Sequence, residues 1–331
     1  MHGLFDWACS QFPTTRERVL LLLDDDSQLA NELSSFYARF DRLNTTCITA
    51  PPPSDASLPP PFIVEECEVR RLFEKQNNRK AAGPDGVFSS TLKHCAEQLA
   101  PVFTTVFNSS VQLSQVPCCF KVSTIIPVPK KLKPASLNDY GPVVLTSVVT
   151  KVLERLVQKF LRSITRDLLD PLQFANRENR LVDDAVSLAL HFILKHLDSP
   201  NRYARILFSD FSSAFDTIVP QKLFEKQLHL SLPLSPCHWI LHSLEDRPQS
   251  VKLNNLQSST IVLNTGARQG CVLSPFLYSL FTNDCISHHS SVQLIKCADD
   301  TAAEGLIENS DESSYRQEDD RFGVLVWKQQ S

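Results

Sequence analysis

The pattern of hydrophobic and polar positions predicts a series of amphipathic helices. Between residues 26 and 43 the apolar positions recur at steps of three and four, which is the spacing of one helix face. Behind Ser147, a residue suited to an N-cap, the apolar positions form an unbroken stripe as far as Ile164. The same reasoning predicts helices over these ranges: 65–80, 90–113, 183–197, from Pro220, 235–244, and from Ser274 as an N-cap to Ile286.

Short apolar segments bounded by turn residues predict strands. Asp210 follows one of them directly, and Asp299 and Asp300 stand at the tip of the last hairpin. Pro127 and Pro129 confine the first strand to a sheet edge, because proline cannot donate to a strand ladder. The strands joined by helices predict an α+β fold, an antiparallel sheet with helices packed on one face. The predicted strands and hairpins cover residues 121–128, 142–145, 203–209, 249–263 and 292–307.

A proline-rich segment divides the chain near its N-terminus. Six prolines stand between residues 51 and 61, a density that excludes a helix and a central strand. We therefore expect a helical N-terminal segment over 1–50, a linker over 51–61 and the main body beyond it. The last stretch, 316–331, is acidic and is expected to be irregular.

Composition and charge narrow the classes of protein that fit. Of the 331 residues 42% are hydrophobic, enough for a sizeable core, and the 8 glycines form neither a dinucleotide-binding nor a P-loop motif. We find no apolar run that could span a membrane and no secretory signal, so we expect a cytoplasmic or nuclear protein that is not secreted. The ten cysteines include no C-x-x-C, which favours reduced thiols over a zinc site.

The charge is unevenly distributed. The net charge is −4, yet residues 70–298 hold 26 Lys and Arg against 17 Asp and Glu. The basic excess is densest over 117–166. A basic body of this kind fits a polyanion partner such as a nucleic acid, and the alternative is an ordinary solvated helix face.

Three carboxylates form the candidate chemistry. Asp210, Asp299 and Asp300 follow or flank apolar strands, and adjacent aspartates repel each other unless a hard cation neutralises them. Two Mg²⁺ ions about 3.5–4 Å apart can activate a 3′-hydroxyl and stabilise leaving pyrophosphate. The alternative is two unrelated surface turns. A further pair, Asp183-Asp184, is interpreted as the start of a helix.

Several short motifs occur one after another along the chain. They are KAAGPDGV (80–87), IIPVPKK (125–131), LNDY (137–140), LTS (145–147), DPLQFA (170–175), FSDFSSAFD (208–216), GCVLSP (270–275) and ADDT (298–301). In this order they resemble the reverse transcriptase of LINE-type (non-LTR) retrotransposons, of the kind abundant in fish genomes. The resemblance covers about residues 62–315 and is far more specific than any single motif.

The resemblance implies a right-hand polymerase fold, with fingers over 62–200 and a palm over 201–315. It implies an RNA-directed DNA polymerase that uses an RNA or DNA template with a primer, dNTPs and two Mg²⁺ ions. Asp210 and Asp299 resemble the metal ligands, with Phe211 a backbone ligand neighbour and Asp300 in support.

The resemblance also assigns roles in substrate binding. Phe215 resembles the steric gate that rejects a ribose 2′-hydroxyl, although taken alone it reads as a core phenylalanine. Gln269 and Gly270 resemble the box that lets template and nucleotide approach the backbone. Lys130 or Lys131 resembles the fingers lysine that contacts the triphosphate, and the alternative for both is a solvated loop lysine.

The chain departs from the family pattern at several positions. Gly141 stands where the family usually has arginine, and Cys297 stands where it has an aromatic residue. Arg268 and Asn176 replace a usual Pro and Tyr, and the pattern stops near residue 316, so we expect the thumb to be missing. These departures suggest a truncated, partly degenerate copy with weak or absent polymerase activity. The alternative function is a non-catalytic, nucleic-acid-binding remnant of such an element.

Overall fold

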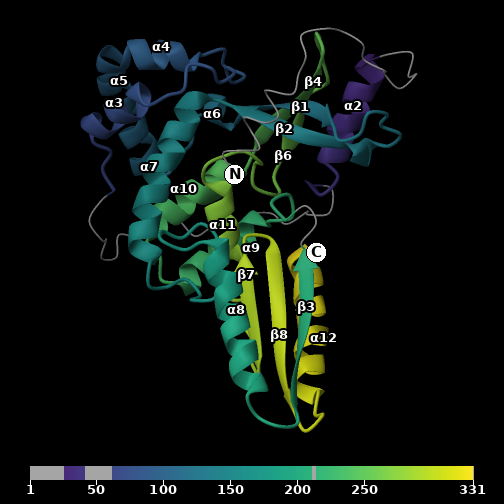
Figure 1. Ribbon diagram of the computed structural model, residues 1–331. Coiled ribbons are helices and arrows are strands. Elements are labelled where there is room, and N and C mark those ends of the chain that lie inside the picture. The colour runs from purple at the N-terminus through teal and green to yellow at the C-terminus, as the bar shows by residue number, and fades with distance from the viewer. Residues whose placement is uncertain (1–25, 42–61, 211–213, 331) are drawn as a thin grey trace.

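The computed structural model describes residues 26–41, 62–210 and 214–330, apart from the side chains of Asp210 and of residues 322–330 (Figure 1). Its strands form two separate sheets, whereas the sequence predicted one. The five-stranded sheet contains β1 (Ser123–Pro129), β2 (Tyr140–Thr146), β4 (Arg247–Leu253), β5 (Leu256–Gln257) and β6 (Ile261–Leu263). The three-stranded sheet contains β3 (Arg202–Asp210), β7 (Val292–Cys297) and β8 (Asp300–Glu308), in the order β3-β8-β7.

Helices surround both sheets. The predicted helix over 90–113 is broken at Cys95 into two helices, and Ser274 lies inside its helix, whose N-cap is Leu273. The described helices are α2 (Asp26–Tyr37), α3 (Glu66–Glu74), α4 (Ser89–His94), α5 (Ala96–Gln112), α6 (Cys118–Lys121), α7 (Val148–Thr165), α8 (Val182–Leu197), α9 (Pro220–His229), α10 (Leu234–Leu244), α11 (Ser274–Phe281) and α12 (Ser313–Gln330).

The main hydrophobic core forms around α7, as its apolar stripe predicted. Val152 and Leu161 are fully buried there, among side chains from α3, α5, α10 and α11. The Ser147 hydroxyl accepts hydrogen bonds from the backbone N–H groups of Val149 (3.1 Å) and Thr150 (3.4 Å), which confirms the N-cap. The loop around Gly83 packs against this same helix start.

The five-stranded sheet corrects two predictions. β1 lies between β2 and β4, so it is not an edge strand, and it runs parallel to β4, so the sheet is not purely antiparallel. The pairs with β4 cover only Ser123–Ile125, which leaves Pro127 and Pro129 beyond the second ladder. The prolines therefore limit how far β4 pairs along β1 without excluding β1 from the sheet interior. Helix α2 packs on this sheet and shares a core with β1, β2 and β4.

The three-stranded sheet has helices on both faces, where the sequence predicted one covered face (Figure 1). Ile295 of β7 packs with α8, while Val292 and Ile307 pack with Tyr315 of α12 on the opposite face. The tail expected to be irregular is thus helical over most of its length. The linker over 51–61 falls outside the described residues, and the proposed division at residue 200 stays a prediction.

Candidate active site

The three predicted carboxylates belong to neighbouring strands of the three-stranded sheet. In the antiparallel ladder of β3 and β8, Asp210 pairs with Asp300, although the two stand far apart in the chain. Asp299 lies in the tight turn between β7 and β8, next to Ala298, whose φ of 61° closes the turn. Asp299 is half-buried and Asp300 is exposed. The backbone therefore brings all three residues to one end of the sheet.

The pKa of Cys297 reflects the electrostatic environment of this turn. Burial raises the pKa of its thiol above the ordinary value, and the negative charges of Asp300 and Asp299 raise it further because they disfavour a thiolate. The end of the sheet thus carries a negative potential. A bound cation would reduce this negative potential, whereas a bound anion would increase it.

The donor set at this end of the sheet suits a hard divalent cation. Carboxylate oxygens are the ligands that Mg²⁺ prefers, and Asp299 and Asp300 supply them beside Asp210. Among the described side chains, no group of three or more His, Cys, Asp and Glu residues is placed to hold a metal ion. The side chain of Asp210 and the whole of Phe211 lie outside that description.

Phe215 lies close to the core. Its ring is half-buried against the main hydrophobic core and meets the ring of Tyr278 edge-on, with 5.6 Å between the centroids. Its carbonyl accepts a hydrogen bond from the N–H of Ala267 at 2.6 Å, which ties the segment after β3 to the loop before α11. Packing therefore fixes the orientation of this ring, and its role as a steric gate stays a prediction.

The loop that carries Gln269 and Gly270 lies against the same segment. The Gln269 side-chain amide donates to a carboxylate oxygen of Asp216 at 3.1 Å. Gly270 has a φ of 73°, and a Cβ there would lie 3.4 Å from the carbonyl oxygen of Val144. Its conformation favours glycine and brings the backbone of this loop close to β2.

Asp216 lies beside the candidate site and was not among the residues selected from the sequence. Burial raises its pKa to about 6, while Arg39, Arg247 and the Gln269 hydrogen bond act in the opposite direction. Its place six residues after Asp210, at the end of the segment FSSAFD, was the available signal. The carboxylate anchors the glutamine of the loop, which is a supporting role.

The two predicted loop lysines lie on the turn between β1 and β2. Lys131 forms an ion pair with Asp139 at 2.7 Å, which together with backbone hydrogen bonds lowers the pKa of Asp139 to about 2. Lys130 is exposed, and its aliphatic chain lies beside Gly141. Lys131 is therefore already engaged, while Lys130 remains accessible to an anion.

A third lysine, Lys151, was not chosen from the sequence. Burial lowers its pKa, and the neighbouring positive charges of Lys80 and Arg155 lower it further. Cys271 and Glu154 act in the opposite direction and raise that pKa. The cationic group of Lys80, Lys151 and Arg155 thus gathers at the start of α7, near the loop of Gly270. Lys151 and Arg155 stand one turn apart on α7, within the basic run 117–166, whereas Lys80 comes from a distant segment that sequence spacing could not connect to them.

Comparison with known proteins identifies the family. Residues 128–305 match the family model described as "Reverse transcriptase (RNA-dependent DNA polymerase)", which is more than half of the chain. The chain belongs to the reverse transcriptase family. The matched region includes β3, the first part of β8 as far as Gly305, the Gln269 loop and the acidic turn.

Curated relatives define the branch of the reverse transcriptase family. A "Probable RNA-directed DNA polymerase from transposon X-element" of Drosophila melanogaster is 31% identical over 71% of this chain and 26% of its own length. A second from "transposon BS" is 31% identical over 77% of the chain and 29% of its own length, and one from "mobile element jockey" is 29% identical over 76% and 28%. The resemblance to LINE-type, non-LTR elements is thereby confirmed. The chain spans about a quarter of the length of these relatives.

Within the described part of the chain, no helix combines the length and the apolar character needed to cross a bilayer.

Proposed function

We propose that this reverse transcriptase domain has a fingers-and-palm architecture that brings a primer, an RNA or DNA template and a dNTP to the acidic turn. The observation that carries the proposal is the pairing of Asp210 with Asp300 across β3 and β8, one residue from Asp299. The three-stranded sheet would be the palm. The region of β1, β2 and α7 would belong to the fingers, and the five-stranded sheet would connect it to β4, β5 and β6 of the range 201–315.

In this proposal Asp210 and Asp299 hold two Mg²⁺ ions, with the Phe211 backbone nearby and Asp300 in support. The ions would supply Lewis-acid activation of the primer 3′-hydroxyl and stabilise the charge of the departing pyrophosphate. The residues of this chain do the rest. Phe215, held edge-on against Tyr278, would exclude a ribose 2′-hydroxyl by its volume.

Positive charge beside the site would bind the triphosphate and the template. Lys130 is accessible for this role, and the group of Lys80, Lys151 and Arg155 adds a second candidate. The Gln269–Gly270 loop, anchored by Asp216, would let the nucleotide and template approach the backbone. Holding the reactants in line matters because an error of about 1 Å can cost on the order of 10²-fold in rate.

A second candidate function is a nucleic-acid-binding remnant that does not polymerise. Gly141 favours it, because the arginine that the family resemblance implies at this position would offer a bidentate phosphate contact, and a lysine side chain replaces such a contact poorly. We therefore expect the chain itself to show absent or very weak primer extension. A Cβ at position 141 would meet only ordinary contacts, the nearest being Lys130 Cε at 3.5 Å, so the backbone there accepts a side chain without a clash at Cβ.

The test is primer extension on a homopolymer RNA template with Mg²⁺. Two proteins are compared, the chain itself and a chimera. The chimera carries Gly141→Arg, and at its C-terminal end it continues with the segment that follows the matching region in the jockey relative. We expect the chimera to regain extension and Asp299→Ala within it to abolish the activity. Asp183→Asn, in the acidic pair that starts α8, is the matched control and should leave extension unchanged. Activity that survives Asp299→Ala would refute the metal site, and strong extension by the unaltered chain would refute the remnant hypothesis.

A further inference from the structure

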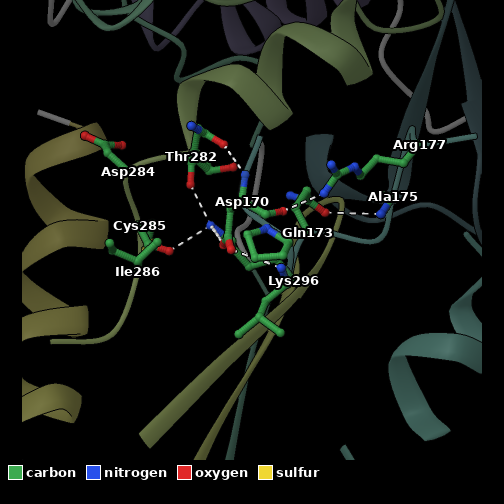
Figure 2. Close-up of polar contacts among 12 residues, drawn as sticks. Asp170, Gln173, Ala175, Arg177, Thr282, Asp284, Cys285, Ile286 and Lys296 are labelled. Carbon is green, nitrogen blue, oxygen red and sulfur yellow. Dashed lines mark hydrogen bonds and ion pairs between the residues drawn. The ribbon is translucent and has the colours of Figure 1, made fainter. Parts of the chain in front are cut away.

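One buried charge joins three segments of the chain just before the acidic turn (Figure 2). Lys296, near the end of β7, is only 2% exposed. Its ammonium forms an ion pair with Asp170 at 2.8 Å and donates to the carbonyl oxygens of Thr282 (2.8 Å) and Cys285 (2.7 Å). An ammonium has three N–H donors, and here each of them has an acceptor.

The backbone of the same residue makes a second set of ties. The N–H of Lys296 donates to the carbonyl of Leu172 at 2.9 Å, and its carbonyl accepts from the N–H of Phe174 at 2.8 Å. The N–H of Asp170 donates to the side chain of Asn283 at 2.7 Å. The segment from Asp170 to Phe174, the end of α11 and β7 therefore form one interlocked unit.

Stability alone does not explain a buried ion pair of this kind. Removing two charges from water is costly, and well-packed apolar residues of similar size often stabilise a fold as much or more. What an ammonium with three fixed acceptors provides is a defined geometry, because each N–H must reach one particular oxygen. The position of this geometry in the chain is therefore informative.

Lys296 stands three residues before Asp299, and α11 begins four residues after Gly270. The ammonium contacts the segment that directly follows α11, at Thr282 and Cys285. It thus links the strand leading into the acidic turn with the helix leading out of the Gln269–Gly270 loop. The Nζ atom of Lys296 therefore connects the acidic turn with the Gln269–Gly270 loop, the two parts of the candidate site.

We propose that Lys296 is a positioning residue, whose ammonium fixes the β7–β8 turn, and with it Asp299 and Asp300, relative to α11. The inference rests on the proposed function in one respect, namely that the β7–β8 turn serves to hold metal ions. The order of the turn itself can be measured without catalysis. Failure of the positioning role and failure of the proposed function are therefore distinguishable.

The test is hydrogen–deuterium exchange of the turn, residues 297–301, in the double variant Lys296→Met with Asp170→Asn. This change removes both charges and keeps the side-chain oxygen that accepts from the N–H of Leu172. We expect the midpoint of urea unfolding to stay close to that of the parent while exchange in the turn becomes about tenfold faster. If this variant does not fold, Lys296→Met with Asp170→Leu allows the same comparison.

Lys226 offers a matched control at the same end of α11. Its ammonium, which comes from α9, donates to the carbonyl of Phe281 at 2.6 Å and to Asp284 at 2.7 Å, and among the described contacts it makes no hydrogen bond or ion pair with β7. Lys226→Met should speed exchange at the end of α11 and leave residues 297–301 unchanged. Unchanged exchange of the turn in the double variant, or an equal change in the Lys226 control, would overturn the positioning role.

A Mn²⁺ titration followed by electron paramagnetic resonance completes the test. We expect the parent to bind Mn²⁺ and the double variant to bind it at least about fivefold more weakly, while the Lys226 control matches the parent. Absence of binding in the parent would refute the proposed metal site, and the exchange result would still decide whether Lys296 orders the turn. Equal Mn²⁺ affinity in the parent and the double variant would contradict the positioning role.

Discussion

At the scale of single residues, Glu304 makes the stability of the domain depend on pH. Its side chain lies within β8 at 1% exposure, one carboxylate oxygen has no hydrogen-bond partner among the described residues, and burial raises its pKa from 4.5 to about 7. The folded state therefore holds this proton at a pH where the unfolded chain has released it. The associated stability is complete below about 4.5 and is lost as the pH rises through about 7.

Glu304→Gln should remove this dependence. The free energy of unfolding of the parent should fall by up to about 3 kcal/mol between pH 4.5 and 8, and that of the variant should lack this fall. Urea denaturation at several pH values measures it, with the exposed Glu74→Gln as a control that keeps the slope. A parallel pH profile for parent and Glu304→Gln would show that the buried carboxyl does not titrate as proposed.

A second prediction at this scale concerns Gly83. A Cβ there would lie 2.7 Å from the backbone N and Cα of Ser147 and from the carbonyl oxygen of Thr146. Gly83→Ala must displace the loop from the start of α7, so it should lower the free energy of unfolding by about 1–3 kcal/mol. Gly141→Ala, where a Cβ meets nothing closer than 3.5 Å, should change it by less than about 0.5 kcal/mol. Equal effects of the two changes would refute the close approach.

At the scale of secondary-structure elements, α12 depends on a contact with β8. The ring of Tyr315 occupies the space beside Gly305, where a Cβ would lie 2.3 Å from a ring atom. Gly305→Ala should therefore destabilise the domain in the presence of Tyr315 and have a much smaller effect in the Tyr315→Ala background. A double-mutant cycle on urea unfolding should give a coupling energy of about 1–2 kcal/mol. Additive effects would mean that α12 is not docked on this strand.

At the scale of the whole molecule, the basic body should bind a nucleic acid through phosphate contacts. The affinity for a single-stranded oligonucleotide should fall linearly with the logarithm of salt concentration, because neutralised phosphates release counterions. Lys151→Gln should weaken binding and reduce that slope by about one, since its charge lies with those of Lys80 and Arg155. Lys93→Gln, on α4, is the control. Salt-independent binding, or its absence at low salt, would contradict the prediction.

The distribution of the basic residues is more varied than the charge count of residues 117–166 indicates. Lys121 is buried, and burial lowers its pKa. Lys159 forms an ion pair with Glu68, and Lys131 forms one with Asp139. Local pairing therefore occupies part of the excess, and the fold adds Lys80 to Lys151 and Arg155 of this run.

The sequence by itself determined the family and most of the helices and strands. Periodicity and capping are local properties, so the stripe and the N-cap of α7 were readable without a fold. The ordered motifs identified Asp210, Asp299 and Asp300 as candidate site residues. The chemistry of a site constrains its residue types even when those residues stand far apart in the chain. The edges of elements were less certain, as at Cys95, where a long apolar pattern continues across a break.

Only the tertiary structure decided how distant segments meet. It divided the strands into two sheets, placed β1 inside one of them in spite of its prolines, and ordered the acidic tail as α12 against Gly305. It also assembled the ammonium site of Lys296 from three segments. These outcomes depend on packing and on which buried polar groups find partners. β1 and β4, like Lys296 and Asp170, meet across more than a hundred positions of the chain. Such pairings leave no periodic trace in a single sequence, and so the fold alone reveals them.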